Sequence, residues 1–325
     1  MAETINQLSL SIPFIYGTDQ CHIIDTSSFP SSYRNEKGKK IEIQSYFNGS
    51  IIRWNSRIIF CCRGDQPSKP DGQGWFENIR LIICELDEDF QPIQGTAKFL
   101  NVTGRKGPNR VEDCRLFVAG GSLYCSYGDG YEMYLARIND KLEALDCENI
   151  THAGVYIPGN DYREKNWTPF SYDGMPFFVY SDNPRMVFDP RKQQFYVGGQ
   201  EITWDYGVIR GGTPAIPYTE GKLITFFHAN VMLSGKDWVD GRVYTMGAML
   251  MQNKPPFMVT HITPMPLMRG ENIYPNPINK NIYVIFPAGI IEDKDSYWVS
   301  LGINDAKTGI IRVSKNLLTG MFRDV

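Results

Sequence analysis

Hydrophobic and polar residues alternate along most of this chain, in short runs separated by turn residues. The runs SIIRWNSRIIFCCR, NIRLIICELD, MPFFVYSD, KLITFFHAN and SYWVSLGIND are rich in Ile, Val, Phe and Tyr. A period of two is typical of β-strands with one buried face, and the GG, DG, NG and EG dipeptides between the runs indicate tight turns. The pattern leaves very little room for helix and predicts an all-β fold.

The strand pattern recurs as a longer unit, in which a polar loop leads into a strand, a turn and a returning strand rich in aromatic or β-branched residues. The copies begin near Gly49, Glu112, Asn166, Gly212 and Asn281. Their spacing averages about 58 residues, which is too long for a solenoid coil and close to a four-stranded propeller blade with insertions. No linker rich in Pro or Ser divides the chain. We therefore predict a single domain over residues 1–325, a five-bladed β-propeller in which residues 1–45 close the ring.

Composition and charge narrow the class of partner. Of the 325 residues, 42% are hydrophobic and 21% are charged, and 30 Gly with 20 Pro fit a globular chain with many turns. The net charge is −3 at pH 7, so no basic field attracts a nucleic acid. Residues 1–20 show no basic stretch followed by an apolar run of signal-peptide length, so we expect no secretory leader, and no run of about 18 apolar residues occurs. We expect a cytoplasmic protein with no nucleic-acid or membrane partner.

The cysteines and histidines form no metal or redox motif. There are seven cysteines but no CxxC or HxxH pair, and most of the cysteines lie inside apolar runs, so we predict buried free thiols. The RGGTP segment lacks the Lys-Ser/Thr pair that completes a phosphate loop. We expect no metal and no cofactor, with inorganic phosphate as a potential co-substrate.

Polar segments lie where predicted strands of different blades begin or end. They are NGS at 48–50 with Arg63, RVEDCR at 110–115, EKNWTPF at 164–170, SDNPR at 181–185, RGGTP at 210–214, HAN from His228 and GIND at 302–305. In a propeller the innermost strands line a central channel and their leading loops open at one mouth, so these segments should converge there. Such side chains suit a polyhydroxylated ligand, because carboxylates and amides bond hydroxyls and an indole face packs on C–H groups. A carbohydrate is the expected partner, and a homo-oligomer is left open.

The segment RVEDCRLF places two adjacent carboxylates, Glu112 and Asp113, between Arg110 and Arg115. Neighbouring residues of a strand point to opposite faces, so at most one of the two carboxylates should share a face with Arg115. That carboxylate is a candidate for catalysis, and the other is expected to anchor backbone. A purely structural ion pair between Asp113 and an arginine is the alternative.

The spaced series VED.R, KNW.PF, GG.P, F.H and VIFPAGII...YWVSLGIND resembles glycoside hydrolase family 130. These five-bladed propellers include β-mannoside phosphorylases, mannosidases and β-1,2-mannosyltransferases, and the resemblance runs from about Phe47 to Asp305. It implies that Asp113 is the catalytic acid, delivering its proton through a hydroxyl of the bound mannose, while Glu112 bonds loop backbone. Cys114 replaces the proline of the family's V-E-D-P-R motif without removing a proton donor. Arg115 would bind an anion or a sugar oxygen and keep Asp113 ionised.

The other candidate residues would contact the sugar or the acceptor. The expected substrate-binding residues are Asn48, Arg63, Arg115, Asn166, Trp167 and Asp305. The expected phosphate- or acceptor-binding residues are Lys165, Arg185, Arg210 and His228. A phosphorylase uses phosphate in place of a glycosidase's second carboxylate and therefore needs a cationic cradle. The chain departs from the family where the strand after KNW ends in Ser181 and Asp182 instead of a phosphate-binding arginine, with Arg185 offset from that place.

The predicted function is phosphorolysis or glycosyl transfer on β-mannosides or related glycosides. Hydrolysis with water and glycan binding without turnover are the alternatives. An invertase-like hydrolase would need a carboxylate in the first blade, where Asn48 stands. Single residues also have structural alternatives: Trp167 in the blade core with Asn166 bonding loop backbone, His228 as a core histidine, and Asp305 as a turn cap.

Overall fold

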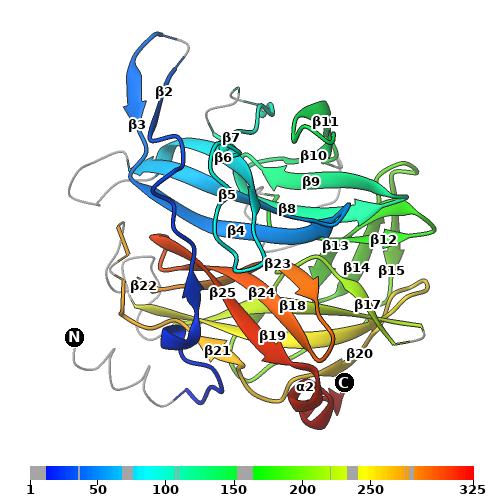
Figure 1. The fold of residues 1–325 in the computed structure, drawn as a ribbon. Helices are drawn as coiled ribbons and strands as arrows, with labels where there is room; N and C mark the ends of the chain where they lie inside the picture. Colours follow the sequence, from blue (N-terminus) through cyan, green and yellow to red (C-terminus); the bar gives the residue numbers. More distant parts are fainter. Residues whose placement is uncertain are drawn as a thin grey trace.

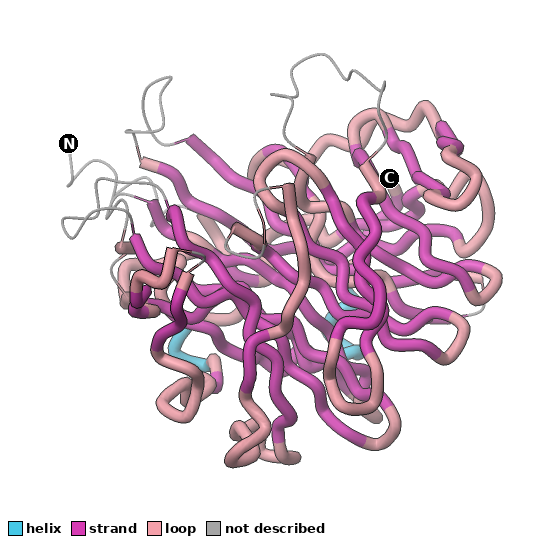
Figure 2. The backbone as a smooth tube through the Cα atoms, turned by 90° about the horizontal axis from the view of Figure 1, so that it is seen from above, coloured by secondary structure: helices cyan, strands magenta, loops and turns pink. Residues whose placement is uncertain are grey.

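The computed structural model shows an all-β propeller arrangement, in which small antiparallel sheets follow one another along the chain (Figure 1). The structure describes residues 12–35, 37–67, 76–105, 107, 110–151, 164–219, 221–232, 241–274, 276–277 and 282–325. Figure 2 shows that strands make up nearly all of the regular structure in these residues. The all-β propeller class predicted from the alternating pattern is confirmed.

Four of the described sheets have the four strands that are standard for a propeller blade. The first contains β4 (Ser45–Trp54), β5 (Arg57–Pro67), β6 (Phe76–Leu86) and β7 (Lys98–Phe99). The second contains β8 (Glu112–Ala119), β9 (Ser122–Gly128), β10 (Met133–Ile138) and β11 (Ala144–Asn149). The third contains β12 (Thr168–Tyr172), β13 (Met175–Asp182), β14 (Arg185–Asp189) and β15 (Gln194–Val197). The fourth contains β23 (Ile285–Glu292), β24 (Ser296–Ile303), β25 (Lys307–Ser314) and β1 (His22–Ile23).

Between the third and fourth of these sheets the chain forms a larger sheet of eight strands. Its strands are β16 (Val208–Arg210), β17 (Ile216–Thr219), β18 (Lys222–Met232), β19 (Arg242–Gln252), β20 (Val259–Ile262), β21 (Met268–Arg269), β22 (Ile282–Tyr283) and β26 (Arg323–Asp324). The long β18 and β19 pair over their full lengths, and short strands pair along their outer edges. The predicted count of five blades is not confirmed, because four of the described sheets have the form of a blade and this one is irregular.

The terminal segments join sheets that lie far from them in the sequence. β1 pairs with β25, with His22 opposite Ile310, and β26 near the C-terminus pairs with β20. The hairpin of β2 (Ser32–Arg34) and β3 (Lys40–Glu42) projects from the body, at the upper left of Figure 1. The described helices are η1 (Thr18–Gln20) and α2 (Lys315–Met321). Neither is long or apolar enough to cross a membrane.

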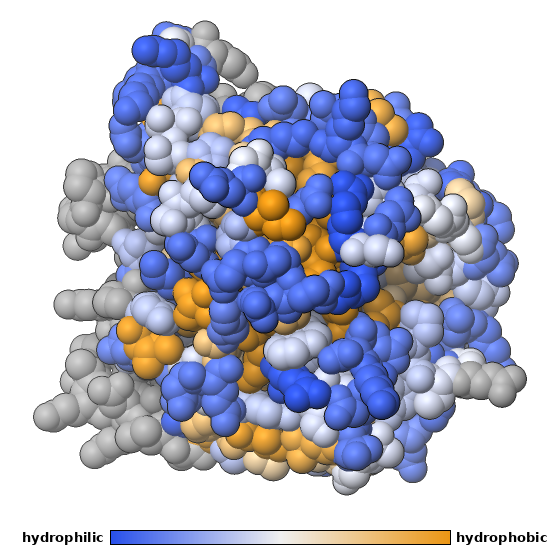
Figure 3. Space-filling model, viewed as in Figure 1, coloured by the Kyte–Doolittle hydropathy of each residue, from blue (hydrophilic) through white to orange (hydrophobic). Residues whose placement is uncertain are grey.

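Alternation along the strands buries one set of side chains between neighbouring sheets. In β24 the residues Tyr297, Val299, Leu301 and Ile303 are buried and pack in one cluster with residues of β18 and β19. The seven cysteines are free thiols, and five of them are buried, as predicted for cysteines inside apolar runs. In Figure 3 hydrophilic residues cover most of the visible face, and hydrophobic residues gather near its centre.

The predicted repeats begin close to the innermost strands. Gly49 lies in β4, Glu112 begins β8, Asn166 precedes β12, and Gly212 lies between β16 and β17. Asn281 lies outside the described residues. Gly212 has no room for a side chain, because an added Cβ would collide with the Phe226 carbonyl oxygen. At this start glycine therefore lets two inner backbone segments approach closely.

Candidate active site

A β-bulge at the start of β8 brings both acidic residues of the RVEDCR segment to one place. The register of the β8–β9 pair shifts between Glu112 and Arg115, and Asp113 has a φ of 54°. This left-handed conformation is uncommon for residues other than glycine. The expectation that the two carboxylates point to opposite faces is wrong, because Glu112 Oε2 and Asp113 Oδ1 each accept a hydrogen bond from Arg63 Nη1 at 3.0 Å.

Arg63 stands at the centre of this group, and its side chain is only 5% exposed. Its Nε and Nη2 donate to the fully buried carboxylate of Asp65 at 3.1 Å and 2.6 Å. We call Arg63, Asp65, Glu112 and Asp113 the Arg63 cluster. Sequence reasoning missed Asp65, although its place two residues after Arg63 on one strand put both side chains on the same face. One guanidinium thus binds three carboxyl groups.

Asn48 reaches Asp113 from the neighbouring sheet. Its Nδ2 donates to Asp113 Oδ1 at 2.8 Å. Like Asp113, it sits at a register shift, between Phe47 and Ser50, and has a positive φ of 52°. Similar local geometry at the starts of β4 and β8 therefore turns the two polar side chains toward each other.

Arg115 ties together inner segments of three sheets. Its Nε donates to the Gly212 carbonyl at 2.6 Å, its Nη1 to the Asp113 carbonyl at 3.0 Å, and its Nη2 to Asn166 Oδ1 at 3.3 Å. The residue is 1% exposed. It therefore lies beside Asp113 as predicted, but its donors already bond protein groups instead of facing an open anion site.

The carboxyl groups of the Arg63 cluster have opposite tendencies to ionise. Burial works to raise the pKa of Asp113, but the Arg63 charge, the Asn48 hydrogen bond and the Arg115 charge together hold that pKa below its usual value. Burial raises the pKa of Glu112, and repulsion from Asp113 adds to this against the attraction of Arg63. Burial also raises the pKa of Asp65 to about 7. Asp113 is the carboxyl group that ionises most readily.

Asp305 lies close to this group after the end of β24. Its Oδ2 accepts a hydrogen bond from Asn276 Nδ2 at 3.1 Å. Burial raises the pKa of Asp305 to about 6, against attraction to Arg63 and with repulsion from Asp113. The neighbouring Asn304 holds the loop in place. Its Oδ1 accepts a hydrogen bond from Val284 N at 2.6 Å, and its Nδ2 donates one to the Glu271 carbonyl at 2.6 Å. Asp305 is therefore held in the electrostatic field of the Arg63 cluster.

Replacing Asp305 with Asn should stabilise the protein at pH 8 but not at pH 4. Burial raises the folded-state pKa of Asp305 to about 6, so the stability that its proton contributes is present below about pH 4 and is lost as the pH rises through 6. Asn carries no charge, and we expect a gain of about 1–2 kcal/mol in unfolding free energy at pH 8. Urea denaturation of both proteins at pH 4 and pH 8 measures this. A gain of equal size at both pH values would contradict the raised pKa.

Trp167 does not present its indole face to a ligand. The residue is 1% exposed, and its ring packs against Phe178, Tyr180 and Phe188. Its Nε1 donates to Glu164 Oε2 at 3.1 Å. The prediction of a sugar-stacking tryptophan is therefore wrong, and Trp167 serves the core of the third sheet. The neighbouring Asn166 stays close to the site through its bond to Arg115.

Arg185 is also not brought to the Arg63 cluster. The residue is fully buried and forms an ion pair with Asp182. Its Nε donates to the Phe257 carbonyl at 3.1 Å, and its Nη2 contacts the Met251 sulfur at 2.9 Å. A phosphate ion would have to displace the Asp182 carboxylate to bind here. The expected phosphate contact at Arg185 does not fit this position.

His228 is buried beside Phe286 and Tyr244, with ring centroids at 4.8 Å and 5.8 Å. Burial, together with repulsion from Arg115 and Arg210, lowers the pKa of His228 to about 3, so the ring is neutral at pH 7. Its Nδ1 is buried and has no hydrogen-bond partner among the described residues. A neutral ring offers no charge to a phosphate, although its unbonded nitrogen can accept a hydrogen bond from a hydroxyl group.

Two of the expected acceptor-binding cations are exposed. Lys165 lies before β12 and attracts the Glu112 carboxylate, whereas Arg210 ends β16 opposite His228. Of the four residues predicted to bind phosphate or acceptor, these two present a positive charge to solvent. The predicted residues that lie around the Arg63 cluster are Asp113, Asn48, Arg63, Arg115, Asn166, Asp305, Lys165, Arg210 and His228. Glu112, which was expected to bond loop backbone, joins them.

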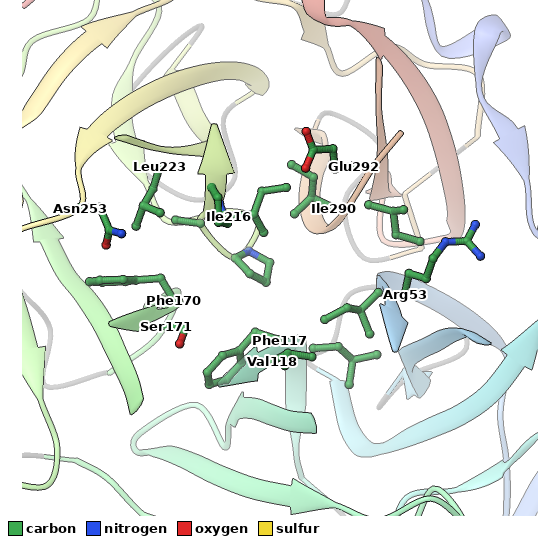
Figure 4. A pocket seen from close by; sticks show the side chains of 16 residues that line it. Arg53, Phe117, Val118, Phe170, Ser171, Ile216, Leu223, Asn253, Ile290 and Glu292 are labelled. Carbon is green, nitrogen blue, oxygen red and sulfur yellow. The ribbon is translucent and has the colours of Figure 1, made fainter. Parts of the chain in front are cut away.

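A separate cavity of about 470 Å³ lies at the other ends of the inner strands. Its lining is mostly apolar and includes Arg53, Phe117, Phe170, Ile216 and Ile290, which come from five different strands (Figure 4). Phe117 lies four positions after Asp113 in β8, a distance of roughly 13 Å along an extended strand. None of the predicted site residues lines this cavity. The acid–base groups and the apolar cavity thus occupy opposite ends of the inner strands.

The Arg63 cluster can perform acid–base chemistry on a polar ligand. Glu112 is 23% and Asp113 18% exposed at the side chain, so a ligand can reach both carboxyl groups. A pair of carboxyl groups with unlike pKa values is the arrangement that proton transfer at neutral pH requires. In the described part of the chain, no group of three or more His, Cys, Asp or Glu residues is suited to hold a metal ion.

Part of the chain matches the model of a known protein family. Residues 177–322 match the model of glycoside hydrolase family 130, described as beta-1,4-mannooligosaccharide phosphorylase. The matched range includes Arg185, Arg210, His228 and Asp305 and begins after Asp113. The resemblance drawn from the sequence motifs is confirmed over this range. No curated protein matches the chain.

Several solved structures are similar to the whole chain. A putative glycoside hydrolase from Parabacteroides distasonis ATCC 8503 has a TM-score of 0.66 and 12% identity, covering 91% of this chain and 96% of its own. A beta-1,2-mannobiose phosphorylase from Listeria innocua has a TM-score of 0.56 and 16% identity, covering 90% and 99%. A mannose phosphorylase from Leishmania mexicana, in complex with phosphate ion, has a TM-score of 0.51 and 12% identity, covering 100% and 96%. At these identities the likeness shows a shared fold.

Proposed function

The chain is related to glycoside hydrolase family 130 through residues 177–322, and we propose that it is an enzyme acting on β-mannosides or related glycosides. The observation that carries this proposal is the Arg63 cluster, in which Glu112 and Asp113 bind one guanidinium nitrogen and remain accessible to a ligand. Two such carboxyl groups match what glycosidic bond cleavage demands, namely a proton for the leaving oxygen and control of charge at the sugar.

In this proposal Asp113 is the proton donor and delivers its proton through a hydroxyl of the bound sugar. Arg63, Asn48 and Asp305 surround Asp113 and can bond further hydroxyl groups, while the neutral His228 can accept a hydrogen bond from one. Lys165 and Arg210 would attract an anionic acceptor such as phosphate. We further propose that residues 1–325 form one propeller domain, in which the eight-stranded sheet acts as a fifth blade.

Hydrolysis or transfer to another sugar is the second candidate. This candidate is favoured because the buried arginines already bond protein groups. Arg115 and Arg185 each donate to protein atoms, and Arg63 binds three carboxyl groups. Of the four residues predicted to bind phosphate or acceptor, Lys165 and Arg210 would then have to supply the positive charge that binds a phosphate dianion. Water or a sugar hydroxyl needs no such cationic cradle.

Product analysis decides between these reactions. The protein is incubated with a panel of β-1,2- and β-1,4-linked mannosides, with and without inorganic phosphate, and the products are separated by chromatography. We expect cleavage of at least one mannoside. Mannose 1-phosphate formed only with phosphate present would establish phosphorolysis, whereas free mannose or longer oligosaccharides without phosphate would establish hydrolysis or transfer. Absence of any product, while the same sugars raise the melting temperature, would refute the enzyme and leave a glycan-binding propeller.

A further inference from the structure

Glu112 and Asp113 bind the same nitrogen of Arg63 but otherwise have unequal surroundings. Asp113 Oδ1 accepts from two donors, Asn48 Nδ2 at 2.8 Å and Arg63 Nη1 at 3.0 Å. Among the residues that the structure describes, the Glu112 carboxylate has one side-chain donor, Arg63 Nη1 at 3.0 Å. Hydrogen bonds to the ionised form favour ionisation, so the better-bonded Asp113 should carry the negative charge.

The charges of the Arg63 cluster do not balance if every carboxyl group is ionised. Arg63 supplies one positive charge, and Asp65, Glu112 and Asp113 would supply three negative charges in a place where the Arg63 and Asp65 side chains are 5% and 0% exposed. Like charges at such short separations are not ionised together at low dielectric. Arg115 and Lys165 add positive charge nearby, but Arg115 donates to backbone and amide oxygens and Lys165 is exposed to solvent. At least one carboxyl group of the cluster is therefore expected to hold a proton at neutral pH.

We propose that Glu112 holds this proton in the resting site and supplies it to Asp113 when a glycoside binds. Burial raises the pKa of Asp65 to about 7, but Asp65 is not placed to supply a proton at the ligand, because it bonds Arg63 through both oxygens and is sealed from any ligand. Glu112 is the more exposed member of the acidic pair. The proposal rests on the proposed function and adds a proton-supplying residue that acts through Asp113.

The proposed mechanism consists of four proton transfers, and each proton released is taken up by a named group. The Glu112 O–H bond breaks as an Asp113 O–H bond forms, through a hydroxyl or a water between them. Asp113 then gives a proton to a hydroxyl of the bound sugar, and the proton originally on that hydroxyl goes to the leaving glycosidic oxygen. Glu112 is left as a carboxylate, which Arg63 neutralises, and it regains a proton from solvent before the next turnover.

The charged groups around Glu112 come from several elements and favour different states. The positive ones are Arg63 of β5, Arg110 before β8 and Lys165 before β12, and the negative ones are Asp113, Asp65 and Asp305. The pKa shifts agree with the hydrogen bonds. Burial raises the pKa of Glu112, whereas the Arg63 charge and the Asn48 hydrogen bond lower the pKa of Asp113 despite its burial.

The first test reads the protons directly and needs no turnover. The side-chain carboxyl carbons of 13C-labelled protein are titrated by NMR, and the two resonances are identified by their loss in Glu112→Gln and Asp113→Asn. We expect Glu112 to titrate above its ordinary range and Asp113 below it. The reverse order would overturn the proposal, whether or not the protein is active. Glu143→Gln, an exposed change on the β10–β11 hairpin, serves as the matched control.

The second test compares leaving groups. Wild-type kcat/KM on a mannobiose should fall as the pH rises, because Glu112 loses its proton. In Glu112→Gln we expect kcat/KM on mannobiose to fall about 100-fold at pH 7, with the basic limb moved to lower pH. With 4-nitrophenyl β-mannoside, whose leaving group needs no proton, the loss should be about threefold or less. Equal losses on both substrates, or an unmoved basic limb, would refute proton supply by Glu112. If the wild-type protein cleaves no mannoside, the proposed function fails. The order in which Glu112 and Asp113 titrate by NMR then decides alone whether Glu112 holds the proton.

Discussion

Replacing Asp113 with Asn is expected to lower kcat on a mannobiose by about 1,000-fold or more while leaving the fold intact. General acid catalysis contributes roughly 100- to 10,000-fold, and Asp113 is the group placed to deliver the proton. Asn is well suited to the φ of 54° at this position. Its side-chain oxygen can still accept from Asn48 and Arg63. Initial rates from chromatography and a melting curve of the same sample give both quantities.

Ligand binding by Asp113→Asn can be measured separately from catalysis. Asp113→Asn should still bind mannobiose, because Arg63, Asn48 and Asp305 remain in place, and calorimetry on the inactive variant measures this. Glu148→Gln, which changes an exposed residue of β11 in the second sheet, should retain activity within about threefold, since surface changes away from special sites are usually small. Turnover by Asp113→Asn within threefold of wild type would show that Asp113 is not the acid.

Replacing Arg63 with Gln should destabilise the protein strongly at pH 8 and much less at pH 5. Loss of the guanidinium leaves Asp65, Glu112 and Asp113 without their shared counter-charge, and removing one partner of a buried ion pair costs about 3–5 kcal/mol. Burial already raises the pKa of Asp65 to about 7, and without Arg63 the carboxyl groups would hold protons to still higher pH. The stability of such protonated groups is present at low pH and is lost as the pH rises through their folded-state pKa.

Urea denaturation at pH 5 and pH 8 measures the Arg63 effect. Arg57→Gln is the matched control, since Arg57 lies on the same strand and pairs with Glu85 at 2.9 Å, but both side chains are about a quarter exposed, at 27% and 24%. That pair should contribute about 1 kcal/mol or less at either pH. If Arg63→Gln loses no more stability than Arg57→Gln, or loses the same amount at both pH values, Arg63 is not the shared counter-charge of Asp65, Glu112 and Asp113.

The propeller class could be read from the sequence because alternating strands and their recurrence depend on local patterns. The position of Asp113 could be read as well, since it stands within a recognisable motif. The shared binding of Glu112 and Asp113 could not, because a bulge shifts the register and depends on how β8 meets β9. A strand viewed alone predicts opposite faces for adjacent residues.

Burial explains the other differences. Arg185 and Trp167 stand in polar sequence segments that suggested ligand contacts, yet both are buried. Arg185 bonds the Phe257 carbonyl and pairs with Asp182, and Trp167 packs against Phe188. The sequence shows neither which side chains lie across from them nor how much solvent remains. Asp65 was missed although its spacing from Arg63 puts both side chains on one face of β5, because a shared face does not show that the two groups bond each other.

The short strand β1 has a bearing on how the protein behaves in solution. β25 would be an edge strand without it, because β1 pairs His22 with Ile310 and Ile23 with Gly309. An unpaired edge presents free backbone groups on which another chain can add a strand, which is a common route to aggregation. Two residues near the N-terminus thus shield the last sheet against self-association. A purification tag is therefore safer at a position that leaves His22 and Ile23 in register with β25.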